Sequence, residues 1–426
     1  MRKLVASLLI LPLLLLFGVL YYNSIKTEET YRAQLEQLNQ NYPGLLRLQL
    51  VDYQRGLLES KAQLALQLQN QPPLDLTQQI QHLFWGLTIT TRLAEESPLA
   101  KRLAARLPLA DLQLITEVKL SGASQTSFAL PFADFEIEEG RLSFKNLNFN
   151  CRMNGQLSSA EIDFQLGALE LQEQQSSLRL SGLALTSQLS ELQGLPLGGG
   201  ELTLAHLSVA AADQPAFDLK GLRYQVASRL DGEKFSSALA LTLAELELLN
   251  EKFRAAELKL TLAGIDAATL RNVQQSAQQL QADLLEGQVD PLLLKLQLFG
   301  LYAQLLRDGT SLQLERLALQ AEDGGLQGRG GVSLVGTGPL SFERLKAELL
   351  FDLDSGAFAA LFRLFDSLQR QGQPAQNRAV LTEQAEQLAG AFIQKGLLSR
   401  REDGGYRSEL KIEQGNAELN GTPFRL

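Results

Sequence analysis

The sequence predicts an α+β protein: an N-terminal transmembrane helix, then an extended, bulged antiparallel β-sheet body with a few amphipathic helices in the C-terminal third. Three patterns predict this class. Residues 4–22 carry no charge, apolar and polar residues alternate with a period of two over 112–262, and apolar residues recur at helical spacing after residue 266. At 426 residues the chain exceeds one ordinary core. We expect a membrane anchor over 1–26, a stalk helix and first β/α unit over 27–110, an antiparallel β body over 111–265 and a mixed helix and strand unit over 266–426.

The apolar run over 4–22 is the first element. As a helix with about 1.5 Å of rise per residue it extends roughly 28 Å, which matches the hydrocarbon thickness of a bilayer. A cleaved signal peptide is the alternative, but the run exceeds the usual apolar region of about 7–15 residues and no small-residue cleavage site follows it. Tyr21, Tyr22 and Asn23 instead fit the aromatic belt of a membrane exit. The lipid bilayer is therefore a predicted partner of residues 4–22.

Charge sets the orientation and excludes one class of partner. Arg2 and Lys3 precede the apolar run, and the positive-inside bias keeps such an N-terminus in the cytoplasm. We therefore expect the chain to cross the membrane once and to place its C-terminal body on the far side, which in a bacterium means a span in the inner membrane and a body in the periplasm. The formal net charge of -9 argues against nucleic acid, which binds basic surfaces. A single cysteine, Cys151, cannot form an internal disulfide; we expect a buried thiol, with a reactive thiol as the alternative.

The segment after the anchor predicts a helix and a strand pair. Residues 27–40 have an amphipathic helical pattern, which we interpret as a stalk, and Pro43 and Gly44 end it. Apolar residues then alternate with polar ones on both sides of a turn near Arg55 and Gly56, as in a β-hairpin with one leucine face. The apolar positions are Leu46, Leu48, Leu50, Leu64, Leu66 and Leu68.

This turn carries a family resemblance. Residues 51–60 read Val-Asp-Tyr-Gln-Arg-Gly-Leu-Leu-Glu-Ser, and Tyr53, Arg55 and Gly56 resemble the Tyr-x-Arg-Gly signature of the YdgA-like family of bacterial inner-membrane-anchored periplasmic proteins, which have no known function. The strand-to-helix junction at 258–266 and the closing segment at 415–421 are similar in kind, so the resemblance extends over nearly the whole chain. It implies a periplasmic body anchored in the inner membrane and supplies no activity.

Residues 79–107 depart from that family. The resemblance leads us to expect His-Gly-Pro here, and the sequence has only Trp85-Gly86 and Ser97-Pro98. Residues 79–90 fit a strand or a helix. Ser97-Pro98 is a suitable N-cap and first position for a helix. The apolar positions of that helix are Leu99, Leu103 and Leu107, and its basic positions, which suit water or anionic lipid headgroups, are Lys101, Arg102 and Arg106.

Glycines interrupt the β body. At Gly182 and Gly221 the apolar residues change parity, which requires a bulge or a tight turn. We prefer a bulge at Gly221, because Asp231-Gly232 is the better hairpin turn, and both alternatives stay open at Gly182. Further turns are expected at 139–140 and 154–155. Leucine-rich sheets of this kind resemble, remotely and at the level of the fold, the groove-forming AsmA-like envelope proteins, whose apolar concave face is thought to hold lipid.

The last third mixes helices and strands. Asp266 is the expected cap of an amphipathic helix, and 291–301 is a buried helix or strand. The glycine-rich run 324–331 has no Gly-Lys-Ser/Thr and precedes a strand pattern, so we interpret it as a hairpin turn or bulged strand and not as a nucleotide site. Residues 342–353 fit a strand, and a hairpin turning at 414–416 closes the chain.

Two helices before that hairpin share an aromatic stripe. Ser355 is the expected cap of the first helix, and a polar connection leads to its antiparallel partner. Core packing between the two is the expected role, and docking onto a groove or a partner is the alternative. The stripe consists of Phe358, Leu361, Phe362, Phe365 and Leu368, facing Leu381, Ala385, Leu388, Phe392 and Ile393.

The sequence indicates no enzyme. Its two histidines, His82 and His206, are too few for a histidine metal site, and a serine triad would need one of them. His206 continues the parity of Leu202 and Leu204, so we expect it on the packed side or at the edge of the sheet. No serine stands in Gly-x-Ser-x-Gly. We therefore expect no catalytic, metal or cofactor residue, although a hydrolase with paired carboxylates is a third alternative.

These observations favour a non-catalytic role at the envelope. The first hypothesis is a membrane-anchored periplasmic body that binds or scaffolds an apolar ligand such as lipid on a leucine-lined sheet. The second is a protein-interaction module in envelope assembly or secretion. Both need the anchor at 4–22, and they differ in whether the apolar surface contacts lipid or a protein.

Overall fold

The structure is a computed structural model that describes most of the chain after residue 24. The predicted anchor at 4–22 and the apolar segment at 291–299 lie outside the described residues. No helix within the described part is long and apolar enough to cross a membrane. The described residues are 25–36, 39, 46–68, 73–97, 100–101, 112–137, 140–156, 158–173, 175–192, 195–211, 214–249, 251–285, 300, 304–305, 309–336, 341–369 and 377–424.

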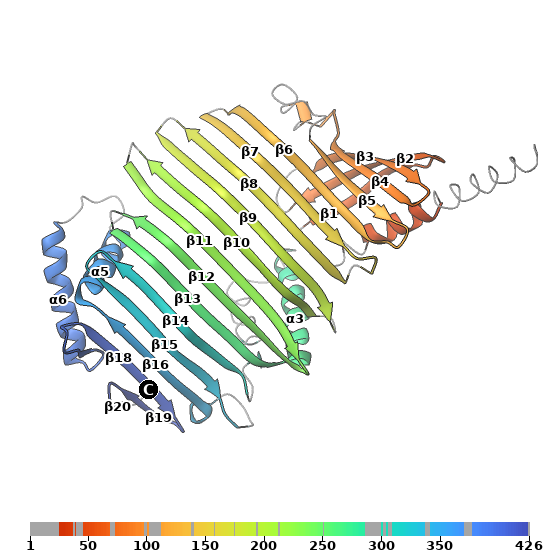
Figure 1. Cartoon of the computed structure of the whole chain (residues 1–426). Coiled ribbons are helices and arrows are strands. Elements are labelled where there is room, and N and C mark those ends of the chain that lie inside the picture. Colours follow the sequence, from red (N-terminus) through yellow and green to blue (C-terminus); the bar gives the residue numbers. More distant parts are fainter. Residues whose placement is uncertain are drawn as a thin grey trace, which may run out of the picture. The chain divides into compact units, whose positions relative to one another are not determined.

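The chain divides into two compact units. The first consists of Met1–Phe135, Lys145–Gln165 and Gln278–Pro291, and the second of Glu136–Phe144, Leu166–Ala277 and Leu292–Leu426. In the first unit each strand from β1 to β6 pairs antiparallel with the next (Figure 1). Residues 79–90 fall in β3 and β4, which decides for the strand. The strands are β1 (Leu46–Gln54), β2 (Glu59–Leu68), β3 (Leu74–Leu83), β4 (Gly86–Leu93), β5 (Gln113–Lys119) and β6 (Ser124–Ile137).

The second unit contains a longer antiparallel run. Each strand from β9 to β16 pairs with the next, β16 pairs with β18, and β17, β19 and β20 complete the edge. The prediction of a predominantly antiparallel β protein with a few helices is confirmed. β7 (Gly140–Met153) and β8 (Ser159–Glu173) contribute residues to both units. The other strands are β9 (Ser176–Leu192), β10 (Leu195–Ala211), β11 (Gln214–Asp231), β12 (Lys234–Leu248), β13 (Glu251–Asp266), β14 (Ser311–Ala321), β15 (Gly324–Leu334), β16 (Leu345–Leu353), β17 (Ser399–Arg400), β18 (Tyr406–Glu413), β19 (Asn416–Leu419) and β20 (Thr422–Phe424).

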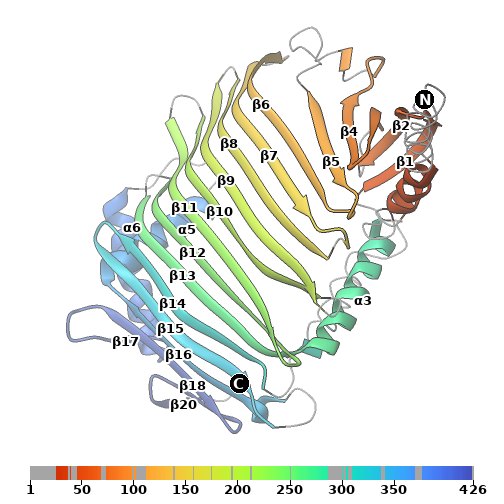
Figure 2. The same cartoon turned by 45° about the vertical axis from the view of Figure 1, so that its right-hand side comes forward.

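The first helix, residues 25–36, packs on the first strands (Figure 2). Tyr31 is buried in a cluster with Ala62, Leu64 and Ile80, and Leu35 packs against the same cluster. The pattern therefore reflects burial against β2 and β3. The predicted stalk helix therefore packs on the strands of its own unit, because its apolar side forms part of the core of the first unit.

A row of small residues crosses the strands from β9 to β13. Gly182, Ala205, Gly221, Ala244 and Ala255 stand opposite one another, and the pairings resume in the same register on both sides of each. The backbone is left-handed at Gly182 (φ 63°), Gly221 (φ 65°) and Ala255 (φ 50°). The prediction of a tight turn is thus wrong for both glycines, and neither glycine inserts an unmatched residue as a bulge does. Instead, each strand has a kink opposite the kink of its neighbour, so the side chains of neighbouring strands switch faces at the same level.

These kinks keep leucines on one face. On one side of the kink, Leu207 of β10 pairs with Leu180 of β9 and with Leu219 of β11. On the other side, Leu204 of β10 pairs with Leu183 of β9. The opposite face is polar and carries cross-strand ion pairs. Across strands, Arg223 lies 3.0 Å from Glu201 and Lys220 lies 3.0 Å from Glu245. Within β11, Lys220 also lies 3.3 Å from Asp218. Such a difference between faces is typical of antiparallel sheets.

Three helices of the second half begin close to the predicted positions: α3 (Ala267–Leu285), α5 (Ser355–Gln369) and α6 (Arg378–Gln394). The short 3₁₀ helix η2 (Phe342–Arg344) has no predicted counterpart. The predicted cap at Asp266 is confirmed, because its carboxylate accepts a hydrogen bond of 2.8 Å from the backbone N–H of Thr269. Ser355 is the first helical residue of α5, so the predicted cap is wrong by one position: the carbonyl of Asp354 accepts from the N–H of Phe358 at 3.0 Å.

The aromatic stripe is only partly core. The rings of Phe358 and Phe392 meet edge to face with centroids 6.4 Å apart, and Phe358 also contacts Tyr406 at 5.5 Å. Phe365, however, is exposed. The face of α5 that packs against the sheet is built instead from Ala357 and Ala360 with neighbouring leucines. The prediction fails at Phe365 because α5 contacts the sheet through Ala357 and Ala360, whose small side chains let the helix approach closely. The spacing of the phenylalanines does not indicate which side of the helix makes this contact.

Most predicted turns are confirmed. Asp231 pairs with Lys234 across the turn between β11 and β12, and the glycine-rich run forms β15, whose pairing with β14 contains a register shift. The last predicted turn centres on Gln414 and Gly415, both with positive φ, and Asn416 already belongs to β19. The sequence missed β20, and it missed the short helix η2 at the start of the predicted strand over 342–353.

One buried ion pair joins β13 to the two C-terminal helices. The Arg363 guanidinium donates to both carboxylate oxygens of Glu251 at 2.6 and 2.8 Å, and its third nitrogen donates to the Thr382 hydroxyl at 3.2 Å. Both charged residues are buried. The bond to Glu251 raises the pKa of Arg363. A bidentate geometry with a further acceptor offsets the large desolvation cost of burying these charges.

Replacing Gly221 tests the matched kink. Gly221→Ala should destabilise the second unit by more than the roughly 1–2 kcal/mol of a left-handed backbone, because its Cβ would lie 2.8 Å from the Cβ of Ala244. Gly232→Ala is the matched control, since φ is +61° there and nothing lies within 4 Å of an added Cβ. Gly221→Ala combined with Ala244→Gly should remove the part of the destabilisation that comes from the contact between the two Cβ atoms. Denaturant unfolding measures these differences, and equal losses in both single variants would contradict the close contact.

Replacing Arg363 tests the buried ion pair. Arg363→Met should lower the unfolding free energy by about 3–5 kcal/mol, because the Glu251 carboxylate would stay buried without its partner. Arg378→Met, which removes an exposed pair with Glu322, should cost less than about 1 kcal/mol. The combination of Arg363→Met with Glu251→Leu should recover most of the loss in thermal and denaturant unfolding. A double variant as unstable as Arg363→Met would show that the cost is not an unpaired charge.

Candidate functional site

The signature residues meet at the turn between β1 and β2. Tyr53 lies near the end of β1, and Arg55 and Gly56 form the turn. Arg55 lies 4.0 Å from Glu28 of the first helix. A Cβ on Gly56 would lie 2.0 Å from the carbonyl oxygen of Glu59, so only glycine fits here. The structure therefore brings Tyr53, Arg55 and Gly56 together and joins this turn to the helix.

Tyr53 holds the helix against the sheet. Its ring centroid is 5.9 Å from that of Tyr31, and the Arg32 guanidinium carbon is 5.9 Å from the Tyr53 ring. The Tyr31 hydroxyl donates to the side-chain oxygen of Gln78 at 2.6 Å. Burial raises the pKa of both tyrosines, and nearby Ser60 opposes the rise at Tyr53. Both phenols are therefore neutral over the physiological range.

A buried serine and histidine lie beneath the turn. Ser60 is fully buried, and its Oγ lies 2.9 Å from Nε2 of His82, which is also buried. The Ser60 Oγ accepts a hydrogen bond of 3.2 Å from the backbone N–H of Gly56. The backbone N–H of His82 donates to the carbonyl of Leu58 at 2.8 Å. The cluster thus links the signature turn to the end of β3.

The hydrogen bonds indicate which nitrogen of His82 carries the proton. The Ser60 hydroxyl lies 3.5 Å from the Gly56 carbonyl, so it has an acceptor there, and its two lone pairs can accept from Gly56 and from His82. This assignment places the proton on Nε2 and leaves Nδ1, which is buried and unbonded within the described residues, as a lone pair. An unpaired buried acceptor costs less than the unpaired N–H of the other tautomer. Desolvation lowers the pKa of His82.

This arrangement is poorly suited to nucleophilic catalysis. A serine nucleophile needs access to its substrate and a histidine whose facing nitrogen accepts the proton. Ser60 is closed off from solvent, and the preferred tautomer of His82 donates toward it. The cluster can instead fix the turn that carries Tyr53 and Arg55. Sequence reasoning missed the Ser60–His82 pair, although both residues share the inward parity of Ala62 and Ile80.

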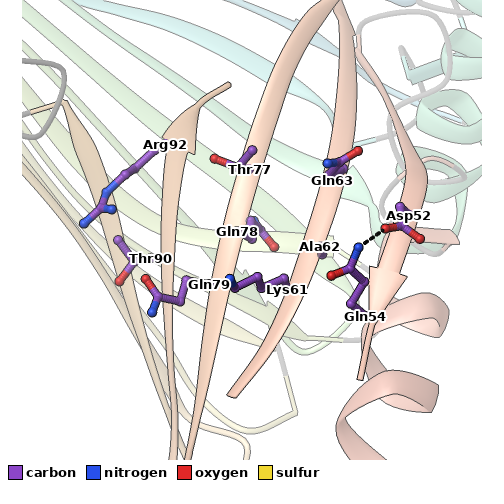
Figure 3. Close-up of a pocket in the computed structure, with 10 residues that line it drawn as sticks. All are labelled: Asp52, Gln54, Lys61, Ala62, Gln63, Thr77, Gln78, Gln79, Thr90 and Arg92. Atoms are coloured by element: carbon purple, nitrogen blue, oxygen red, sulfur yellow. Dashed lines mark hydrogen bonds between the residues drawn. The ribbon is translucent and has the colours of Figure 1, made fainter. Parts of the chain in front are cut away.

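A shallow hollow of about 260 Å³ lies over β1 to β4 (Figure 3). Its lining is mostly amides and hydroxyls, with one carboxylate and two cations, and Gln54 donates to Asp52 at 2.9 Å. Such side chains offer hydrogen-bond donors and acceptors to a polar ligand. No sequence pattern indicated the hollow, because it combines residues of four strands that are separated in the sequence. The lining residues are Asp52, Gln54, Lys61, Ala62, Gln63, Thr77, Gln78, Gln79, Thr90 and Arg92.

Two residues differ from their predicted environments. His206 lies on β10, between β9 and β11, and its Nε2 is 2.7 Å from a carboxylate oxygen of Asp218. The prediction of a packed or edge position is wrong, because the parity change at Ala205 turns His206 to the polar face. Cys151 is half-buried, and burial raises the pKa of its thiol, which disfavours the reactive thiolate. Among described residues, no three His, Cys, Asp or Glu side chains could together hold a metal ion.

Acidification should loosen the signature turn through His82. The pKa of His82 is lowered in the folded state, so its contribution to stability is complete above about pH 6.5, where the unfolded histidine titrates, and is lost as pH falls toward the folded value. His82→Gln retains a hydrogen-bond donor for Ser60, costs about 1 kcal/mol, and should show a weaker acid dependence. Hydrogen exchange of the β2 and β3 amides at several pH values, corrected for intrinsic rates, measures the difference.

His206→Gln is the control for this prediction. It removes the other histidine of the chain from a half-buried position in the second unit, so it should leave the pH dependence of β2 and β3 unchanged. A His82→Gln protein that loses protection on acidification as steeply as the parent would assign the effect to other groups.

Comparison with known proteins provides a family but no activity. No curated protein and no solved structure matches the chain significantly. A family model described as a bacterial protein of unknown function (DUF945) matches residues 1–426. The match spans both units and the signature turn. The chain therefore belongs to the bacterial protein family of unknown function DUF945.

Proposed function

We propose that this chain is a single-pass inner-membrane protein whose periplasmic body binds an apolar ligand, such as a lipid acyl chain, without catalysing a reaction. Residues 4–22 form the anchor in this proposal, and the positive-inside bias of Arg2 and Lys3 sets its direction. The resemblance of Tyr53, Arg55 and Gly56 to the YdgA-like signature supports the same compartment. The ligand site is the apolar face of the second unit.

A ladder of paired apolar residues supports the ligand site. One residue from each of six consecutive strands, β9 to β14, pairs with the next across the sheet. All six side chains are half-buried, so each retains apolar surface in contact with solvent. We call this set the leucine ladder; it consists of Leu185, Leu202, Tyr224, Leu241, Leu258 and Leu317.

Neighbouring rungs widen this surface. A second row of apolar residues pairs in the same way beside the ladder, so the apolar surface is two rows wide. This row consists of Val226, Leu239, Leu260 and Leu314. Covering apolar surface yields about 25 cal/mol per Å², or about 0.8 kcal/mol for each CH₂ of the ligand. An extended acyl chain lying across several strands therefore matches this surface in both shape and chemistry. The remote likeness to AsmA-like proteins agrees with this proposal at the level of fold.

A protein-interaction module is the second candidate. Phe365 of α5 and Val380 of α6 are both exposed although the two helices pack together. Exposed apolar residues on adjacent helices suit a protein partner in envelope assembly or secretion. The two candidates predict different occupants at different surfaces, so cross-linking at each surface separates them.

Photo-cross-linking in vesicles tests the proposal. The full-length chain is reconstituted with a phospholipid that carries a diazirine near the end of its acyl chain, irradiated, and mapped by peptide mass spectrometry. Adducts are expected in peptides of the leucine ladder as well as in 4–22. Leu241→Gln should lower the adducts in the body about tenfold, which corresponds to about 1.4 kcal/mol of lost apolar contact.

Thr242→Gln is the matched control for this experiment. Thr242 neighbours Leu241 on β12 but pairs with Arg223 and Glu257, so it stands on the polar face. This variant should retain the lipid adducts, and thermal unfolding confirms that both variants are folded. Adducts restricted to 4–22, or equal losses in both variants, would count against a lipid-binding face. The interaction module is tested in parallel with a photoreactive amino acid in place of Phe365 in the producing cells, where repeated capture of one protein, together with no lipid adducts in the body, would favour that module.

A further inference from the structure

Large apolar side chains are exposed at one end of the first unit. The exposed fractions are 61% for Leu58, 41% for Phe84, 68% for Trp85 and 70% for Leu120. These residues come from the turn between β1 and β2, the turn between β3 and β4, and the turn between β5 and β6. Soluble surfaces seldom gather such side chains. We call these four residues the hairpin rim.

The antiparallel order places the hairpin rim at a single end of the sheet. In a meander, every second turn lies at the same end, and these are the first, third and fifth turns. Backbone contacts confirm that the turns are adjacent. The N–H of Leu120 donates to the carbonyl of Trp85 at 3.2 Å, and the N–H of His82 donates to the carbonyl of Leu58 at 2.8 Å.

The first helix begins at that same end. Its early residue Glu28 lies near Arg55 in the turn between β1 and β2, whereas Asn39 hydrogen-bonds to the backbone of Leu48, which lies toward the start of β1. The helix therefore runs antiparallel to β1, and residue 25 lies toward the hairpin rim. Three residue steps separate residue 25 from residue 22, the last of the apolar run, and they span at most about 11 Å.

We propose that the hairpin rim inserts into the interfacial layer of the membrane that holds residues 4–22. This inference rests on the proposed anchor, because the anchor supplies the bilayer within reach of the rim. The chemistry of the rim fits a bilayer surface: tryptophan favours the headgroup level, and Phe84 and the two leucines favour the acyl boundary. Arg55 and Lys119 flank the turns and suit anionic headgroups.

The signature turn acquires a role in this arrangement. Tyr53 and Arg55 bind the helix to the turn, and Ser60 and His82 fix the turn to β3. The first unit is thereby held as one body between the anchor and the rim. Two attachment points, the span and the rim, would fix how this unit stands on the bilayer, whereas a span alone permits rotation.

Trp85 provides a direct test because the chain contains one tryptophan. The full-length protein is reconstituted in phosphatidylcholine and phosphatidylglycerol vesicles whose acyl chains carry bromine either near the glycerol or near the methyl end. Bromine near the glycerol should quench Trp85 emission about twofold and more strongly than bromine near the methyl end, because an interfacial residue sits only about 5–10 Å deep. Flotation of the vesicles in the same samples shows independently whether the anchor holds.

Variants separate the rim from the anchor. Leu120→Asp and Leu58→Asp should each weaken the quenching and shift Trp85 emission to longer wavelength while the protein still floats with the vesicles. Val335→Asp, at an exposed apolar position of the second unit, should leave the quenching unchanged. Floating protein with unquenched Trp85 would overturn the rim and leave the anchor intact. Protein that fails to float would overturn both.

Discussion

The second unit depends on keeping one face apolar although the apolar positions of its strands change parity midway. Gly182 and Gly221 accomplish this with a left-handed backbone, and Ala205 and Ala244 supply the small side chains that such an approach permits. Because the kinks stand opposite one another, the register continues without a shift, and every strand changes parity at the same level. The same change turns His206 toward Asp218 on the polar face. One row of small residues thus decides both which leucines share the apolar face and which charged residues pair on the opposite face.

The sequence predicted the fold best where a single local rule acts. Alternation predicted the β body, Asp231-Gly232 a hairpin, and Asp266 a helix cap, because each depends on neighbours in the chain. Prediction failed where a partner distant in sequence decides. The sequence did not indicate what the helix at 25–36 packs against, because its partners Ala62 and Ile80 come much later, and Phe365 was assigned to the core although alanines make that contact. Of the candidate site, Tyr53, Arg55 and Gly56 were found through a resemblance, whereas the Ser60–His82 contact needed three dimensions.

The two buried polar clusters join elements that are far apart in the sequence. Glu251 and Arg363 are far apart in sequence, yet their bidentate contact joins the start of β13 to α5 and, through Thr382, to α6. Ser60 and His82 similarly join a turn to the end of β3. A buried polar group without a partner is costly, so each cluster disfavours arrangements in which its partner is displaced. Both clusters therefore specify where elements meet, and neither leaves a reactive atom open to a substrate.

The choice of leucine is informative about the apolar face. Valine and isoleucine have the stronger strand preference, so strand stability alone does not explain why leucine dominates paired positions such as 202, 241 and 258. Leucine branches one carbon further from the backbone, and its side chain is less restricted at χ1 than that of a β-branched residue. A surface of such side chains can adjust to a flexible occupant, whereas a rigid β-branched surface suits a fixed interior. The half-buried state of these leucines and the choice of leucine over β-branched residues therefore both agree with the proposal that a ligand or a partner covers this face.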